Sequence, residues 1–163
     1  MAVDMFLKID DVAGESKDSK HAGSIDVLSW SWDLTNAGNA HIGGGAGAGK
    51  VNVHNLNVTK YVDKGSTVLA LACCNGKHFK QALLTVRKAG DKPLEYLKIK
   101  MEDVLVSSFG TGAPVSTGRA ELLTENIGFN FAKVTMEYVP QKQDGSGDAS
   151  VKMGWNIAGN VKM

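Results

Sequence analysis

The sequence predicts a mainly β protein: a curled two-sheet β-barrel with one short α-helix and an extended glycine-rich hairpin arm. The first observation is that apolar and polar residues alternate over most of the chain, as they do in half-buried strands. The second is that four of these strands change phase once near their middle, which is typical of a β-bulge that bends a strand. Long strands that bend midway favour a closing barrel or a curled sandwich over a flat sheet.

The alternation defines the strands in chain order. We expect them at residues 3–9, 25–34, 51–62, 82–88, 97–106, 127–138 and 151–157. The phase changes fall between Val27 and Leu28, Val53 and Leu56, Met101 and Val104, and Phe131 and Val134. Loops rich in glycine and polar residues are expected at 14–18, 90–93, 111–114 and 144–148. No repeat or linker divides the chain, so we expect one domain covering residues 1–163.

A single helix is expected between the strands that end near 62 and begin near 82. Asp63 or Ser66 could cap its start, residues 68–74 form an apolar body, and Asn75-Gly76 would end it with a left-handed residue. Because the segment is apolar on most sides, we expect the helix to fill the inside of the curled sheet. Its adjacent cysteines, Cys73 and Cys74, are expected to be small buried hydrophobic residues, not a disulfide.

The glycine-rich stretch from Gly43 to Lys50 resembles a phosphate-binding loop, because Gly44 and Gly49-Lys50 have that motif's spacing. A phosphate loop ends in Ser or Thr and opens a helix, whose N-terminus binds the anion. Here Val51 follows the lysine and begins an alternating, strand-like segment. We therefore expect residues 38–50 to be a flexible arm between two strands, and a nucleotide hydrolase is the less favoured alternative.

Composition and charge exclude several classes of function. The net charge of +1 offers no general attraction to nucleic acid, and no apolar run is long enough to span a membrane. Residues 1–33 carry seven acidic and three basic side chains, whereas residues 50–100 carry ten basic and three acidic ones. This asymmetry suits a subunit that attracts copies of itself. Residues 1–4 show no feature of a secretory signal, so we expect synthesis in the cytoplasm, and any export would not use an N-terminal signal peptide.

The sequence shows no catalytic or metal-binding pattern. The histidines are scattered, and none has a partner at metal-ligand spacing: they are His21, His41, His54 and His78. No serine lies in a nucleophile elbow and neither cysteine has a neighbouring base. We therefore expect a protein that is not an enzyme and binds no cofactor or metal.

Trp30-Ser31-Trp32 lies at the centre of the second predicted strand. Both indoles would point to one face, whereas Ser29, Ser31 and Asp33 would point to the other. The polar face could simply be solvated above a core-facing tryptophan pair. Alternatively, it could line an enclosed, water-filled space.

The chain resembles the haemolysin-coregulated protein (Hcp) family over essentially its whole length. The similarity is carried by Asp4, Phe6, Lys8 and Ile9, by Gly14-Glu15-Ser16, Asp18, His21 and Ile25, and by Ser29-Trp30-Ser31-Trp32. It continues through the glycine arm to Lys50, then Thr59-Lys60-Tyr61, Gly76-Lys77-His78, Arg87-Lys88-Ala89-Gly90, Leu123-Thr124-Glu125-Asn126 and Lys152-Met153-Gly154-Trp155-Asn156. Asp33 departs from the small residue common at this position in the family and adds a negative charge there.

The resemblance implies a tube subunit of the bacterial type VI secretion system. Such subunits assemble as hexameric rings that stack inside a contractile sheath, are expelled beneath a spike protein, and hold small effector proteins in the ring as their chaperone. A tail-tube subunit of a phage-like contractile particle is the alternative. We expect Ser29, Ser31 and Asp33 to face the lumen and cargo. Residues Gly43, Gly44, Gly45, Gly47, Gly49 and Lys50 would form an inter-subunit arm, and Gly90, Asp91, Lys92 and Ala158 would take part in ring stacking.

Overall fold

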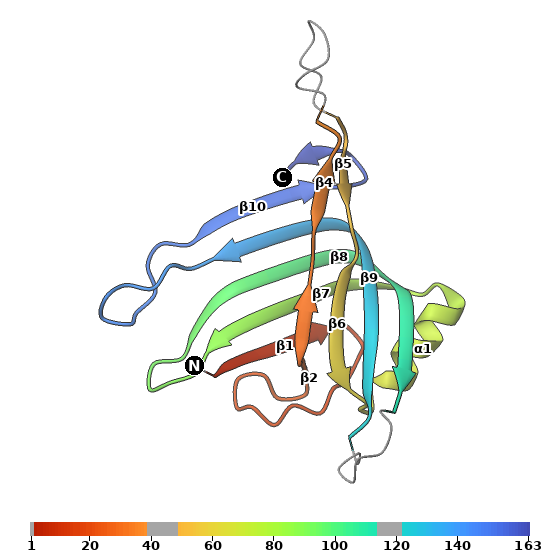
Figure 1. Cartoon of the computed structure of the whole chain (residues 1–163), viewed down its shortest axis with the longest axis horizontal. Coiled ribbons are helices and arrows are strands. Elements are labelled where there is room, and N and C mark those ends of the chain that lie inside the picture. Colours follow the sequence, from red (N-terminus) through yellow and green to blue (C-terminus); the bar gives the residue numbers. More distant parts are fainter. Residues whose placement is uncertain (1, 39–48, 114–121) are drawn as a thin grey trace, which may run out of the picture.

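The computed structural model describes residues 2–38, 49–113 and 122–163, and these form a strongly curved antiparallel sheet with one helix at its side (Figure 1). The elements are β1 (Val3–Ile9), β2 (Ile25–Asp26), β3 (Ser29–Ser31), β4 (Leu34–Asn36), β5 (Val51–Val53), β6 (Leu56–Tyr61), α1 (Ser66–Asn75), β7 (His78–Lys88), β8 (Leu94–Gly112), β9 (Thr124–Tyr138), β10 (Val151–Asn156) and β11 (Val161–Lys162). The mainly β class with one short helix is confirmed.

The sheet has two parts that share the long strands β8 and β9. It contains nine strands in the order β11-β10-β9-β8-β7-β1-β2, with β6 added to β9 and β3 added to β6. The C-terminal half of β9 pairs with β10, whereas its N-terminal half pairs with β6. We call β3, β6, residues 124–129 of β9 and residues 106–112 of β8 the wall. The main sheet consists of β1, β7, β10 and the remaining halves of β8 and β9.

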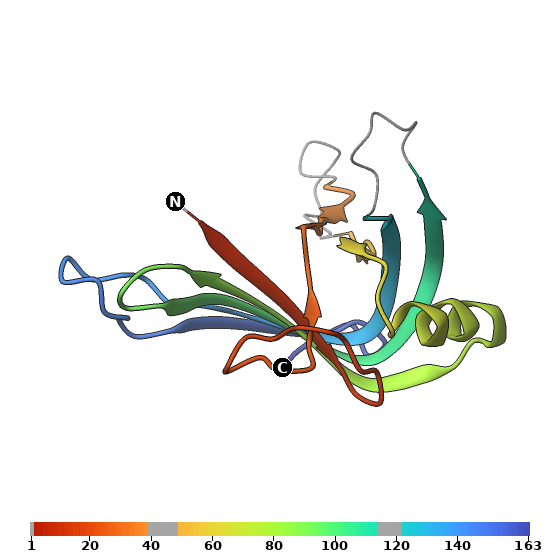
Figure 2. The same cartoon turned by 90° about the horizontal axis from the view of Figure 1, so that it is seen from below.

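The two parts meet at a bend that crosses three neighbouring strands (Figure 2). The buried residues change phase between Phe79 and Ala82 in β7, and at the matching positions of the two neighbouring strands: between Met101 and Val104, and between Phe131 and Val134. The predicted phase changes in β8 and β9 are therefore confirmed. Their predicted cause, a bulge in a single strand, is wrong at this place, because the register continues through it.

Asp103 lies at this bend in a left-handed conformation, with φ of 54°. The neighbouring pairs Gln81–Glu102 and Phe79–Val104 are in register on either side of it. The strands thus turn together, so that the apolar side chains stay on the inner side of the curve. True register shifts occur elsewhere, between Val86 and Arg87 and between Val106 and Ser108.

The second predicted strand, 25–34, is divided into three short strands. β2 pairs with β1, β3 pairs with β6, and β4 pairs with β5 in a separate two-stranded ribbon. The predicted phase change between Val27 and Leu28 is the point where the chain leaves one partner for the next, since Val27 N–H donates to Met5 and Leu28 N–H to Thr59. The predicted strand 51–62 is divided in the same way into β5 and β6, and β11 was not predicted.

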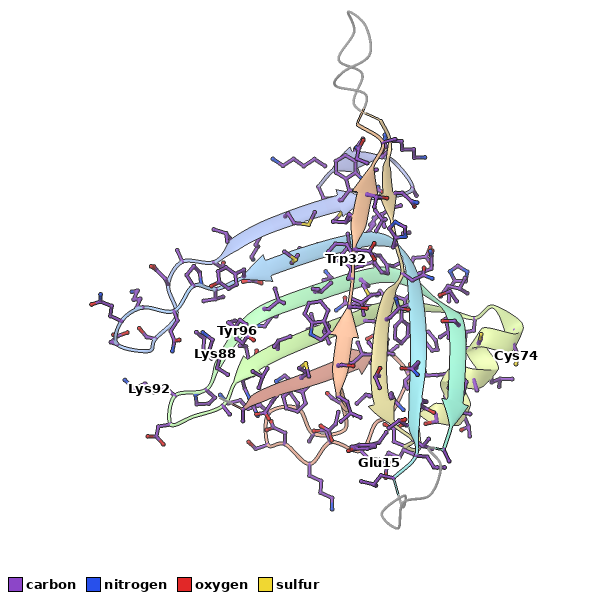
Figure 3. All side chains as sticks on the ribbon, viewed as in Figure 1. Glu15, Trp32, Cys74, Lys88, Lys92 and Tyr96 are labelled. Atoms are coloured by element: carbon purple, nitrogen blue, oxygen red, sulfur yellow. The ribbon has the colours of Figure 1, made fainter. Side chains whose placement is uncertain are left out.

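Helix α1 packs against β8 by one face only, with Ser66, Leu69 and Ala72 buried. The prediction that the helix fills the inside of the sheet is wrong, because Leu71 is 61% exposed on the opposite face. Cys73 is half-buried and Cys74 exposed, so the expectation of two buried cysteines is also wrong. Figure 3 shows Cys74 on the outer side of the molecule.

A glycine caps each end of α1. The residue at the N-cap is Gly65, whose N–H donates to Asp63 Oδ1 at 2.9 Å, and not Asp63 or Ser66 as predicted. At the C-terminal end the prediction is confirmed, because Gly76 is left-handed with φ of 69° and its N–H donates to Ala72 O.

A buried ion pair links β6, β9 and the start of α1. Lys60 is fully buried, and its ammonium donates to the carboxylate of buried Glu125. The same ammonium donates to Asp63 Oδ1 at 3.1 Å and to Ser66 Oγ at 3.2 Å, while the Ser66 hydroxyl donates to Glu125 Oε1 at 2.6 Å. Each charge therefore has several polar partners, which offset the cost of burying it.

A second cluster fixes the long loop between β1 and β2. Arg87 of β7 donates to Asp18 at 2.6 Å and to Asp4 at 2.9 Å. The hydrogen bond from Arg87, together with backbone hydrogen bonds from Lys20 and His21, holds the pKa of Asp18 well below its usual range. Nearby, the His21 ring stacks on Phe6 with centroids 4.3 Å apart and lies 2.6 Å from Glu95.

Candidate functional site

The outer face of the wall carries two rows of small polar residues and glycines that cross all four strands, followed by a shorter row of Tyr61, Thr124 and Gly112. The strand register places Ser29, Thr59, Asn126 and Gly110 side by side in the first row, and Ser31, Asn57, Gly128 and Ser108 in the second. We call these eight residues the polar face. Neither row contains a charged residue or a large apolar one.

Hydrogen bonds between strands hold the polar face in place. Thr59 Oγ1 donates to Asn126 Oδ1 at 2.6 Å, and next to the second row Asn130 Nδ2 donates to Asn55 Oδ1 at 3.1 Å. Ser29, Ser31 and Asn57 nevertheless remain exposed. The face therefore offers hydroxyl and amide groups to a partner without requiring any charge to lose its water.

Gly128 makes this face flat in its second row. A Cβ placed there would overlap Ser108 Oγ and would lie 3.2 Å from Asn57 Oδ1. The side chains of the neighbouring strands thus close over the glycine, and the surface stays low and continuous.

The opposite side of the wall is apolar and faces the core. The row between the two polar rows consists of Trp30, Val58, Ile127 and Phe109, of which Val58 and Ile127 are buried. Trp30 and Trp32 both pack against the core, as expected for a core-facing tryptophan pair. Strict alternation in β3, β6 and β9 is what separates the polar face from this core.

Asp33 lies beyond the end of β3 and outside the paired rows. It is exposed, with its Oδ2 atom 3.8 Å from His54 Nε2. The His54 N–H donates to Asp33 O at 3.1 Å, and Trp32 Nε1 donates to His54 O. Asp33 thus places a charge at the edge of the polar face, next to an imidazole.

A shallow hollow of about 510 Å³ lies at the other end of the polar face. It is lined by Gly110, Thr111, Gly112, Ala113, Leu122, Thr124 and Asn126. Thr111 and Gly112 belong to β8 here, whereas the sequence predicted a loop at 111–114. The lining is again uncharged, and it combines Thr111, Thr124 and Asn126 with the apolar Ala113 and Leu122.

The glycine arm is described only at its base. Asn36 pairs with Val51 at the end of the β4–β5 ribbon, and Asn36 Nδ2 donates to Gly49 O at 2.7 Å. Gly43, Gly44, Gly45 and Gly47 lie outside the described residues, and the contacts of the arm remain a prediction. Lys50 is followed by strand β5, as predicted, and not by the helix that a phosphate loop requires.

The residues predicted to take part in ring stacking lie at two opposite ends of the main sheet. Gly90, Asp91 and Lys92 form the exposed turn between β7 and β8, and Figure 3 shows Lys92 at its tip. Ala158 lies in the turn after β10, where its N–H reaches Ala132 O at 3.4 Å. The structure does not bring these two groups together within one copy.

The described residues contain no group of three His, Cys, Asp or Glu side chains that could hold a metal ion. The exposed His78 and Asp103 side chains form a pair on β7 and β8, with Nδ1 and Oδ1 2.7 Å apart. Among these same parts of the chain, no helix is both long and apolar enough to cross a membrane. What the polar face can offer is a binding surface.

Ser29 and Ser31 could be predicted from the sequence, whereas their neighbours on the other three strands could not. Those neighbours are Asn57, Thr59, Ser108, Gly110, Asn126 and Gly128. A signal was present in β6, where Asn55, Asn57 and Thr59 alternate with Leu56 and Val58. Only the strand pairing, however, shows that these residues adjoin Ser29 and Ser31.

Comparisons with known proteins agree on one family. Residues 6–138 match the family model described as "Type VI secretion system effector, Hcp". The chain is 56% identical to the protein hcp1 of Pseudomonas aeruginosa over 164 aligned positions, which cover 99% of both proteins. The solved structure of Hcp1 from Salmonella typhimurium is 37% identical and matches with a TM-score of 0.81, all of both chains being covered. A further structure, described as a type six secretion system protein, is 36% identical and has a TM-score of 0.91, with 99% of this chain and 100% of that chain covered.

Proposed function

Because this chain belongs to the Hcp family of type VI secretion system proteins, we propose that it is the structural subunit of the secretion tube. In this role it forms hexameric rings that stack within a contractile sheath, are expelled beneath a spike protein, and carry small effector proteins in their lumen. The observation in this chain that best supports ring formation is the pair of free edges on its wall.

Each side of the four-stranded wall has a strand edge without a partner in the described parts of the chain. β3 pairs with β6 alone, and β7 reaches only to Leu105 of β8, so residues 106–112 pair only with β9. Unpaired edges favour association with another chain. The two edges belong to different strands, so the contact is head-to-tail, and repeated head-to-tail contacts close into a ring when the rotation allows it.

In such a ring, the polar face lines the lumen. Placing the wall of each copy edge to edge would join the rows of Ser29 and Ser31 into continuous polar belts. Hydroxyl and amide groups hold a protein cargo by many weak hydrogen bonds, which also release it readily when the tube arrives. A face without charges in its rows suits cargo proteins of differing net charge, with Asp33 adding one negative site per copy.

Electron microscopy of the purified protein tests ring formation directly. We expect closed rings with a hollow centre, together with a hexamer mass in light scattering. A protein that stays monomeric across a broad concentration range contradicts the proposal.

Substitution of Ser31 by Gln tests the lumen. The larger side chain would project from the middle of the polar face, and we expect retention of a co-purifying effector to fall about tenfold or more while rings persist, which corresponds to about 1.4 kcal/mol of binding free energy. Ser19→Gln, in the exposed loop before β2, is the matched control and should retain the effector. Loss of the rings themselves in Ser31→Gln would show that this face lies between subunits instead.

The arm and the stacking turns have their own tests. We expect a shortened 43–49 segment to weaken assembly before it lowers the stability of the folded chain. An unchanged oligomer would contradict a role for the arm.

Gly90→Cys combined with Ala158→Cys should link stacked rings under oxidising conditions. Links confined to a single ring would contradict the assignment of these turns to stacking.

A further inference from the structure

The inner face of the main sheet is apolar well beyond the region that the rest of the chain covers. Three rows of paired residues cross its five strands: Ile9–Ala82–Met101–Val134–Trp155, Leu7–Leu84–Ile99–Met136–Met153 and Met5–Val86–Leu97–Tyr138–Val151. All fifteen residues are apolar or aromatic. The first row is almost fully buried beneath the core, as a sheet face normally is.

Burial is lost toward the third row and toward β10. Met153 is 38% exposed, Tyr138 43% and Val151 60%. We call Leu97, Met136, Tyr138, Val151 and Met153 the open face. Two shallow hollows mark it, one of about 220 Å³ between Met136 and Val151 and one of about 240 Å³ beside Trp155.

The charged side chains of these strands lie on the opposite side of the sheet, and of them only Lys152 also borders the smaller hollow. Lys98, Glu137 and Lys152 form one row on the opposite side of the same strands. Lys152 and Glu137 are 3.8 Å apart there, and Lys98 lies 3.2 Å from Glu95. A contiguous, uncharged apolar surface of this kind marks an interaction site in soluble proteins.

Helix α1 also has an exposed face without charged residues. Its ten residues, Ser66–Asn75, include no charged side chain. Ser66, Leu69 and Ala72 are buried against β8, but Thr67, Leu71 and Cys74 are exposed on the other face. A helix that is apolar on all sides belongs between two layers, and in the isolated chain only one layer is present.

The two surfaces cannot meet within one chain. Figures 1 and 2 show α1 at one end of the molecule and the first half of β10, which carries Val151 and Met153, at the other. They also lie on the correct sides for a head-to-tail contact. The free edge of β8 adjoins α1, and the main sheet extends past β3, which carries the other free edge.

We propose that the outer face of α1, centred on Leu71, packs onto the open face of the next copy, which then forms its missing helical layer. This inference rests on the proposed ring and assigns its subunit interface to named surfaces. A helix against a sheet is a standard layer arrangement, and neither surface has to desolvate a charge when they join. Each copy offers one helix face and one sheet face, so every copy in a closed ring would be covered on both sides.

Disulfide trapping tests the contact. In a Cys73→Ser, Cys74→Ser background, Leu71→Cys combined with Met153→Cys should give, after oxidation, a ladder of covalent oligomers up to the full ring. Leu71→Cys combined with Lys152→Cys is the control, because the Lys152 side chain lies on the opposite face of β10. It should give little crosslinking.

Mixing the two single-cysteine proteins shows whether the link joins different chains. We expect a covalent dimer from the mixture. A link that forms within one chain, or rings that form normally without any 71–153 link, would overturn this inference and leave the proposed tube function standing. A wild-type protein that forms no rings would instead contradict the proposed function.

Charge insertion gives a second measurement. Leu71→Glu and Met153→Asp should each lower the fraction of protein that is found in rings at least tenfold at equal concentration. The far-ultraviolet circular dichroism spectrum should stay unchanged. Lys152→Asp, the matched change on the far side of β10, should leave the rings intact. Full-size rings from both Leu71→Glu and Met153→Asp would overturn the inference.

Discussion

Lys60 places a positive charge at full burial in the core. Its ammonium has Glu125, Asp63 and Ser66 as partners, and the pair joins β6 to β9 and both to the start of α1. Two buried charges that satisfy each other add little net stability, yet removal of one partner leaves the other uncompensated. The network therefore makes the junction of these three elements specific.

Lys60→Met should lower the free energy of unfolding by about 3–5 kcal/mol, because it strands the Glu125 carboxylate in the core. Chemical denaturation at a fixed protein concentration measures this. The double variant Lys60→Met, Glu125→Leu should regain a large part of the loss. Two losses that simply add in the double variant would show that the charges do not interact.

Asp18 should make stability depend on pH in the acid range. Its pKa is lowered in the folded chain by Arg87, so its stabilising effect is complete above the unfolded value of about 4 and is lost as the pH falls below it. Asp18→Asn should therefore be less stable than the wild type near neutral pH, and the difference should shrink below about pH 4. Asp26→Asn, an exposed carboxylate on β2, is the control and should follow the wild-type curve.

At the scale of single elements, the end of α1 depends on Gly76. Its φ of 69° is strained for residues with a side chain, whereas a Cβ there would meet no atom within 4 Å. Gly76→Ala should cost about 1 kcal/mol from backbone strain alone, with Gly76→Asn less harmful. Gly112→Ala, also in open space but without a positive φ, should be close to neutral in the same denaturation experiment.

The strands that could be predicted well are those whose period-two pattern is long. The phase changes at Met101–Val104 and Phe131–Val134 were visible in the sequence because both sides of the bend are apolar. Their cause was not, since a bulge and a bend shared by neighbouring strands leave the same pattern in one strand. The short strands β2, β3 and β4 could not be separated because their division depends on which partner each segment pairs with.

The polar face could be predicted only in part for a similar reason. Ser29 and Ser31 stand out between tryptophans, but Gly110 and Gly128 carry no side-chain signal and join the face only through pairing. The exposure of Leu71 was missed because an apolar helix indicates burial, and in the isolated chain one face of α1 is uncovered. That difference is itself informative about assembly.

At the scale of the whole molecule, the absence of charge from both rows of the polar face has a measurable effect. Screening by salt weakens charge pairs but has little influence on neutral hydrogen bonds. Retention of an effector by the rings should therefore change less than about threefold between roughly 0.05 and 0.5 M sodium chloride, a range over which the Debye length shrinks to a few ångströms. A steep salt dependence would indicate that charged groups such as Asp33 dominate the contact.

The continuity of β8 and β9 through the bend has a mechanical consequence. These strands, of 19 and 15 residues, each belong to both parts of the sheet, and they are hydrogen-bonded to each other on both sides of the curve. A force applied to one part of the sheet must stretch the covalent backbone and shear the hydrogen bonds between β8 and β9 before the two parts can move relative to each other. In the proposed tube, each subunit would thus transmit an axial force as a single stiff body.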